Sequence, residues 1–66
     1  MKVLYHGNIS HPNRYPVYRV SVSGRDDFSM KRDFKNESEA IGMFMAVIQM
    51  DVVNRDELKG LGFFLV

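Results

Sequence analysis

The sequence contains no cysteine, no strong excess of charge of either sign, and no long apolar run. Without cysteine the chain forms no disulfide, no thiolate-ligated zinc site and no cysteine nucleophile. The longest apolar run, residues 43–48, is far shorter than the roughly 20 residues that a transmembrane helix needs. Residues 1–9 lack the apolar core of a secretory signal. We therefore expect a soluble, cytoplasmic protein that does not contact a membrane.

The charge balance also limits the class of partner. Nine lysine or arginine residues against eight aspartate or glutamate residues give a net charge of +1 and a sequence pI near 8.1. Nucleic-acid-binding domains more typically have a pI above roughly 9, and acidic mimics of DNA carry the opposite charge. With 66 residues, we expect a single domain over 1–66, near the lower size limit for a self-sufficient core. Oligomerisation or a bound partner would help to stabilise so small a core.

No motif in the sequence indicates catalysis. The chain has no nucleophile elbow, no glycine-rich phosphate loop and no HExxH helix. His6 and His11, together with Asp26 and Asp27, can be drawn as a metal site, but their spacing is not diagnostic. Exposed histidines and a turn-forming aspartate pair explain these residues better. We expect no enzyme activity, no cofactor and no metal.

The segment 36–53 has the strongest helical pattern. Asn36 suits the N-cap, Glu39 can complete a capping box, and Glu37 and Glu39 lie at the positive end of the helix dipole. At about 100° per residue, one apolar stripe follows from this pattern. We expect that stripe to cover a sheet, and it consists of Ile41, Phe44, Met45, Ile48 and Val52.

A second apolar stripe runs along the other side of the same helix. It consists of Met43, Ala46, Val47, Met50 and Val53. A single sheet cannot cover both stripes, and a helix that is apolar all round is normally buried. The second stripe is therefore expected to meet the ends of the chain, a second copy of the chain or another protein.

Three segments before the helix have strand character. Alternation of apolar and polar residues predicts strands over 1–6, 17–23 and 28–34, and the turn 24–27 makes the last two a hairpin. Arg32 falls in the inward register of the last strand. It either lies at the sheet margin with its stem packed and its head in water, which we favour, or follows a bulge.

After the helix, Asn54 can cap a short helical turn over 55–59, which Gly60 would end. The apolar tail 63–66 then completes the sheet or packs on the outer face of the helix, and we favour the added strand. The predicted fold class is α+β: a small antiparallel sheet of three to four strands packed on one main helix, in the order β-β-β-α, with a short C-terminal strand.

The surplus of apolar surface indicates a non-enzymatic protein-binding domain whose partner is another protein or a second copy of itself. The predicted partner-binding residues are Met43, Val47, Met50, Phe63 and Phe64. Alternatively, the tail and the helix bury one another within a monomer. A free edge strand offers a second route to association. The size and the lack of motifs suit an accessory or inhibitory protein of a phage or other mobile element that acts on a host protein.

DNA binding through the basic margin of the sheet is the alternative function. The residues that would carry it are Arg14, Arg19, Arg25, Lys31 and Lys35. Sheets can enter a DNA groove. The same face also carries serine and aspartate, however, and offers no aromatic platform for unpaired bases. A solvated sheet face of mixed charge is therefore the favoured interpretation.

Overall fold

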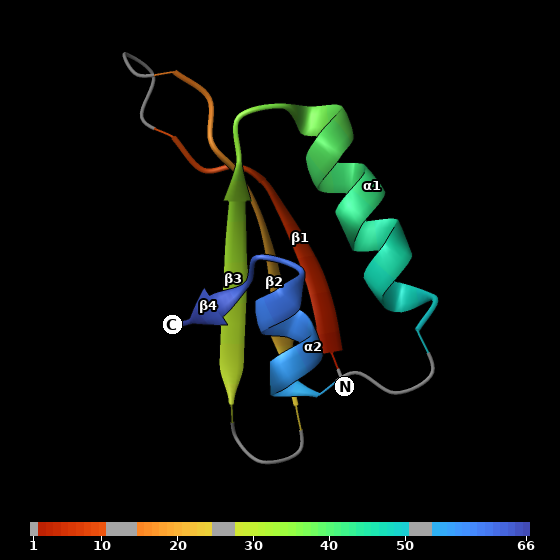
Figure 1. The fold of residues 1–66 in the computed structure, drawn as a ribbon. Helices are drawn as coiled ribbons and strands as arrows, with labels where there is room; N and C mark the ends of the chain where they lie inside the picture. Colours follow the sequence, from red (N-terminus) through yellow and green to blue (C-terminus); the bar gives the residue numbers. More distant parts are fainter. Residues whose placement is uncertain (1, 11–14, 25–27, 51–53) are drawn as a thin grey trace.

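A computed structural model shows three strands, two helices and a short last strand in the described part of the chain (Figure 1). The structure describes residues 2–10, 15–24, 28–50 and 54–66. In chain order the elements are β1 (Lys2–Asn8), β2 (Tyr18–Ser23), β3 (Ser29–Phe34), α1 (Glu37–Ile48), α2 (Arg55–Gly60) and β4 (Phe64–Leu65). The four strands form one antiparallel sheet in the order β1-β2-β3-β4, which confirms the predicted fold class.

The sheet has one mainly apolar face, turned toward the helices, and one mainly polar face, which we call the open face, because its strands alternate as predicted. Val20 and Val22 of β2 are fully buried, and they pair with Arg32 and Met30 of β3 in an unbroken register. No bulge displaces Arg32, so that alternative is wrong. The favoured alternative holds for the inward register only, because the head of Arg32 donates to the Leu61 carbonyl instead of lying in water. In β1 the register shifts between Tyr5 and Gly7, and Gly7 takes a positive φ of 70° there.

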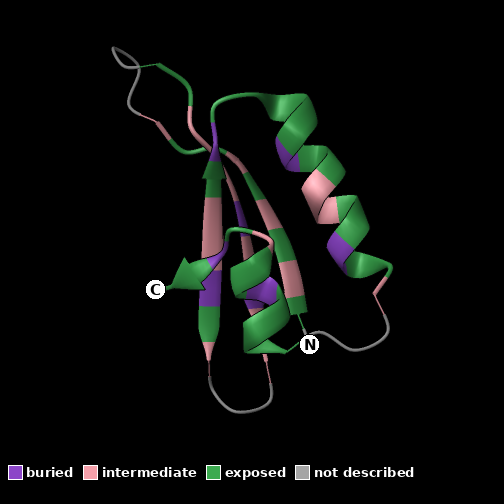
Figure 2. Cartoon of the chain, viewed as in Figure 1, coloured by how far each residue is buried: buried purple, intermediate pink, exposed green. Residues whose placement is uncertain are grey.

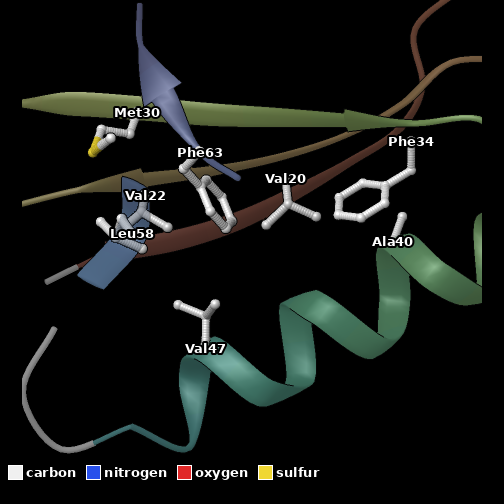
Figure 3. Close-up of a cluster of buried hydrophobic side chains, with 8 residues drawn as sticks. All are labelled: Val20, Val22, Met30, Phe34, Ala40, Val47, Leu58 and Phe63. Atoms are coloured by element: carbon white, nitrogen blue, oxygen red, sulfur yellow. The ribbon is translucent and has the colours of Figure 1, made fainter. Parts of the chain in front are cut away.

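Both helices lie over the apolar face of the sheet. Figure 2 shows that the buried residues lie in β2, β3, α1 and α2 and just before β4. Figure 3 shows the cluster that they form between the sheet and the helices. Its members are Val20, Val22, Met30, Phe34, Ala40, Val47, Leu58 and Phe63.

Helix α1 begins as the sequence predicts and ends earlier. The Oδ1 atom of Asn36 accepts hydrogen bonds from the backbone N–H of Ser38, at 2.9 Å, and of Glu39, at 3.3 Å. The helix ends at Ile48, with Gln49 as its C-cap, although we predicted helix as far as residue 53. The predicted face residues Val52 and Val53 lie outside the described residues.

The predicted assignment of the two faces of α1 is wrong for most residues, although Phe44 faces the core and Ala46 is exposed, as predicted. Ala40 and Val47 are fully buried, and Met43 and Phe44 pack against the core, so the inward stripe follows this 3–4 spacing. In the first turn of α1, just after the short link 35–36, Ala40 meets Phe34 of β3 (Figure 3). Three residues of the stripe predicted to face the sheet are exposed instead, namely Ile41, Met45 and Ile48.

Helix α2 is closed at both ends by local hydrogen bonds. Asn54 Oδ1 accepts a hydrogen bond from the Glu57 N–H at 2.9 Å, as predicted. At the other end, the Phe63 N–H donates to the Leu58 carbonyl at 2.9 Å, and Gly62, with φ +90°, donates to the Lys59 carbonyl at 3.0 Å. This is a Schellman motif, and it packs Phe63 against Leu58 in the core.

The tail adds a fourth strand to the sheet. Lys31 pairs with Phe64 and Met30 with Leu65, and the Val66 N–H donates to the Ser29 carbonyl at 3.0 Å. The predicted strand is confirmed, and the alternative in which the tail covers the outer face of the helix is wrong.

Candidate protein-interaction surface

The outward side of α1 is an uncharged apolar surface. Ile41, Met45 and Ile48 are 41%, 46% and 45% exposed, and their spacing places them on one side of the helix. Between Ala40 and Met50 the sequence has no charged residue. We call the surface of Ile41, Gly42, Met45, Ala46 and Ile48 the α1 face. Interface cores are likewise depleted in charge.

Gly42 and Ala46 have small side chains and leave a shallow strip beside the larger side chains of the α1 face. We call this strip the shelf. A Cβ atom built on Gly42 meets no described atom within 4 Å beyond its chain neighbours and the adjacent helix backbone, and Gly42 itself lies within the helix. Neither backbone conformation nor packing among the described residues therefore requires glycine there. Glycine inside a helix nevertheless costs about 0.5–1 kcal/mol relative to alanine. The shelf lets another backbone approach the helix closely.

The residues that the sequence predicts for partner binding do not form one surface. Val47 is fully buried and Phe63 is 3% exposed, so both belong to the core. Met43 packs half-buried against the same core, and Met50 is half-buried just beyond the end of α1. Phe64 is 51% exposed but pairs with Lys31 on the opposite face of the sheet. The exposed apolar surface of the helix is the α1 face instead, and its three large side chains, Ile41, Met45 and Ile48, were predicted to point inward.

A second exposed apolar segment lies at the edge of the sheet. Phe64, Leu65 and Val66 are 51%, 49% and 79% exposed, and β4 is the last strand of the sheet. We call this segment the β4 edge. Figure 1 places it on the side of the sheet away from α1, so the two apolar surfaces are separate.

An ion pair between Arg19 of β2 and Asp33 of β3 lies on the open face of the sheet. Arg19 Nε and Nη2 donate to the two carboxylate oxygens of Asp33 at 2.7 and 3.0 Å. These hydrogen bonds raise the pKa of Arg19, and the guanidinium lowers the pKa of Asp33. The two N–H groups with which Arg19 could bind a phosphate in a bidentate manner therefore already donate to a carboxylate.

The other residues predicted for DNA binding are likewise engaged or lie outside the described residues. The Lys31 ammonium lies 5.6 Å from the ring centre of Phe64, and the Lys35 ammonium lies 5.8 Å from that of Tyr15. Arg14 and Arg25 lie outside the described residues. DNA binding stays a prediction, to which these contacts add no support.

His6 and Ser21 form the closest approach to a catalytic pair in the described part of the chain. His6 Nε2 lies 2.7 Å from Ser21 Oγ on the open face. A nucleophilic serine also needs a carboxylate that orients the histidine and donors for an oxyanion. The hydrogen bonds of the described residues supply His6 with no carboxylate, and these residues hold no group of three metal-ligating side chains. This pair is a surface hydrogen bond and gives no basis for an active site.

Side chains from distant parts of the sequence hold both helices in place. The Tyr5 hydroxyl donates to Glu37 at 3.0 Å, and its ring lies 6.2 Å from that of Phe44, which ties α1 to β1. Desolvation and this hydrogen bond raise the pKa of Tyr5. Arg32 Nη1 donates to the Leu61 carbonyl at 2.7 Å, and its guanidinium lies 4.5 Å from the Phe34 ring centre. Arg32 thus joins β3 to the end of α2, a role that sequence reasoning missed.

Neither described helix has the length and apolar character needed to span a bilayer. No protein-family model matches the chain, and comparisons with curated proteins and with solved structures gave no match. The α1 face and the β4 edge are therefore interpreted from their own chemistry.

Proposed function

We propose that this chain is a non-enzymatic protein-binding domain whose α1 face receives an amphipathic helix of another protein. The observation that carries this proposal is the exposure of Ile41, Met45 and Ile48 on one side of a helix that has no charge between Ala40 and Met50. Contiguous apolar surface of this kind is typical of interaction sites.

The shape of the α1 face, with a row of large side chains beside a row of small ones, favours a helix as the part of the partner that binds there. Ile41 and Met45 form a ridge four residues apart, and Gly42 and Ala46 form the low row beside it. Packed helices fit the ridges of one into the grooves between the ridges of the other, at axis separations of about 8–10 Å that depend on side-chain size. A partner helix with a ridge of leucine or isoleucine would fit the low row, and no charged group of this face would be desolvated.

Site-specific photocrosslinking tests this proposal. Replacing Met45 by the photoreactive residue p-benzoylphenylalanine puts the reactive group at the centre of the α1 face. Replacing Leu4, which is 42% exposed on the other face of the sheet, gives a matched control. Irradiation in the native cell extract should give a discrete conjugate from position 45 and none of the same mass from position 4.

The double variant Ile41→Lys with Ile48→Lys then shows whether the conjugate depends on the α1 face. Both side chains are exposed, so the variant should fold while losing the conjugate from position 45. Equal conjugates from both positions, or a conjugate unaffected by the two lysines in a variant with unchanged circular dichroism, would refute the proposal.

A further inference from the structure

Within the described residues, β4 is an edge strand that pairs with β3 on one side only. Residues along a strand direct their N–H and C=O alternately to either side. The Val66 N–H bonds Ser29 of β3, and Phe64 pairs with Lys31, so these two residues face β3. Leu65, between them, therefore directs its N–H and C=O away from β3 and toward the open edge.

The two edges of the sheet are protected to different degrees. On β1, Lys2 and the bulge between Tyr5 and Gly7 are features that oppose the addition of another strand. The β4 edge has neither feature. Its three side chains are apolar and about half exposed or more, and none carries a charge.

We propose that a second copy of this chain adds to the β4 edge in antiparallel orientation, with Leu65 opposite Leu65 of the second copy. In this register each Leu65 N–H donates to the Leu65 carbonyl of the other copy, which gives two hydrogen bonds about a twofold axis. Phe64 then lies opposite Val66 of the second copy on the open face, and the same pair repeats on the other side of the axis.

This register makes the edge complementary to itself, which is why a second copy is the occupant. Each exposed apolar side chain of the β4 edge lies opposite another apolar side chain, and no like charges meet. The two sheets join into one continuous sheet. Because α1 and the β4 edge lie on different sides of the sheet in Figure 1, both α1 faces remain free in the dimer. Self-association is therefore independent of the function proposed for α1.

Methylation of the Leu65 backbone nitrogen tests this proposal. The full chain is short enough for chemical synthesis with N-methyl-leucine at position 65, which removes the outward N–H and retains the leucine side chain. Sedimentation equilibrium from about 10 μM to about 1 mM covers the range expected for a weak dimer. The unmodified chain should rise from 7.7 kDa toward twice that mass, whereas the N-methyl chain should stay at 7.7 kDa.

Two controls distinguish loss of pairing at the β4 edge from unfolding of the chain. Slow exchange of the Val66 amide hydrogen in the N-methyl chain shows that β4 still pairs with β3. Leu4→Lys, which changes an exposed apolar residue elsewhere, should dimerise like the unmodified chain. In a mixture of labelled and unlabelled chains, isotope-filtered spectra should show contacts between Phe64 and Val66 of different copies.

Three outcomes would overturn the proposal. The first is a mass of 7.7 kDa at every concentration of the unmodified chain. The second is equal dimerisation of the N-methyl and unmodified chains. The third is a dimer that Met45→Lys abolishes and the N-methyl group does not, because that dimer would form through the α1 face. The photocrosslinking result is independent of all three, so a failure here leaves the proposal for α1 to its own test.

Discussion

Replacing Gly42 by alanine should stabilise the free chain and weaken a complex formed through the α1 face. The stabilisation follows from the conformational freedom that glycine has in the unfolded chain and loses in a helix. The added Cβ meets nothing within 4 Å in the free chain, so no clash opposes this gain. In the complex, the same methyl group would occupy the shelf on which the partner helix packs.

The expected magnitudes follow from the position of Gly42 within α1. An interior glycine is about 0.8–1 kcal/mol less favourable than alanine, and for a domain of this size 1 kcal/mol shifts the Tm by about 4–8 °C. The Tm of Gly42→Ala should therefore rise by about 3–8 °C. Overpacking of a close-fitting contact typically costs about 1–3 kcal/mol, which is the expected loss of binding free energy.

Gly62→Ala is the matched control, because the same substitution should act in the opposite direction. Gly62 has φ +90°, and a Cβ there would lie 3.1 Å from Arg32 Nε. The left-handed backbone alone costs a residue with a side chain about 1–2 kcal/mol. Urea unfolding followed by circular dichroism measures both variants, with unchanged slopes as the sign of an unchanged unfolded state. A lower midpoint for Gly42→Ala, or a raised one for Gly62→Ala, would refute this reasoning.

Three further predictions concern the cap, the core and the ion pair. Asn36→Ala should lower the free energy of unfolding by about 0.5–2 kcal/mol in urea unfolding, whereas Asn36→Asp, which keeps the capping oxygen, should not. Leu58→Ala should cost about 2–5 kcal/mol, a large share of the roughly 3–10 kcal/mol expected for 66 residues, and thermal unfolding would show it as a steep fall in Tm. Because Arg19 lowers the pKa of Asp33 in the folded chain, the ion pair stabilises the fold above the ordinary aspartate pKa of about 3.9 and loses this effect as the pH falls through the lowered value. As the pH falls through this range, the free energy of unfolding of Asp33→Asn should therefore decrease less than that of the unmodified chain, by a difference of less than about 1 kcal/mol. An equal decrease in both chains would contradict this.

The features that the sequence predicted are those set by neighbouring residues. Asn36 and Asn54 cap their helices because an Asn side chain reaches N–H groups two or three residues ahead. The strands follow from alternation, which needs only a few residues to be visible. The fold class followed from the order of these local elements.

The rotation of α1 was not predictable, because apolar residues occupy both sides of the helix. A periodic pattern identifies an inward face only when the other side is polar. Here Val47, and not Met45, joins Ala40 and Phe34 in the core, and such contacts between a helix and a sheet are not visible in the helix sequence. The surplus apolar surface was predicted, but its three large side chains, Ile41, Met45 and Ile48, were assigned to the inward side.

The burial of Phe63 and Phe64 and the hydrogen-bond acceptor of Arg32 could not be predicted from the residues next to them in sequence. Phe63 and Phe64 are alike in sequence, yet the turn at Gly62 directs the first into the core and leaves the second exposed. The acceptor for Arg32 is the carbonyl of Leu61, 29 residues away in sequence. No pattern within β3 indicates such a partner.

The most direct test of this account compares lysine at two neighbouring positions of α1. Met45 is 46% exposed and Val47 is fully buried, so Met45→Lys should change the free energy of unfolding in urea by no more than about 0.5 kcal/mol. Val47→Lys should cost several kcal/mol, because it buries an ammonium group without a partner. Loss of the fold in Met45→Lys with retention in Val47→Lys would show that α1 packs on the sheet through its other side, and the α1 face would not exist.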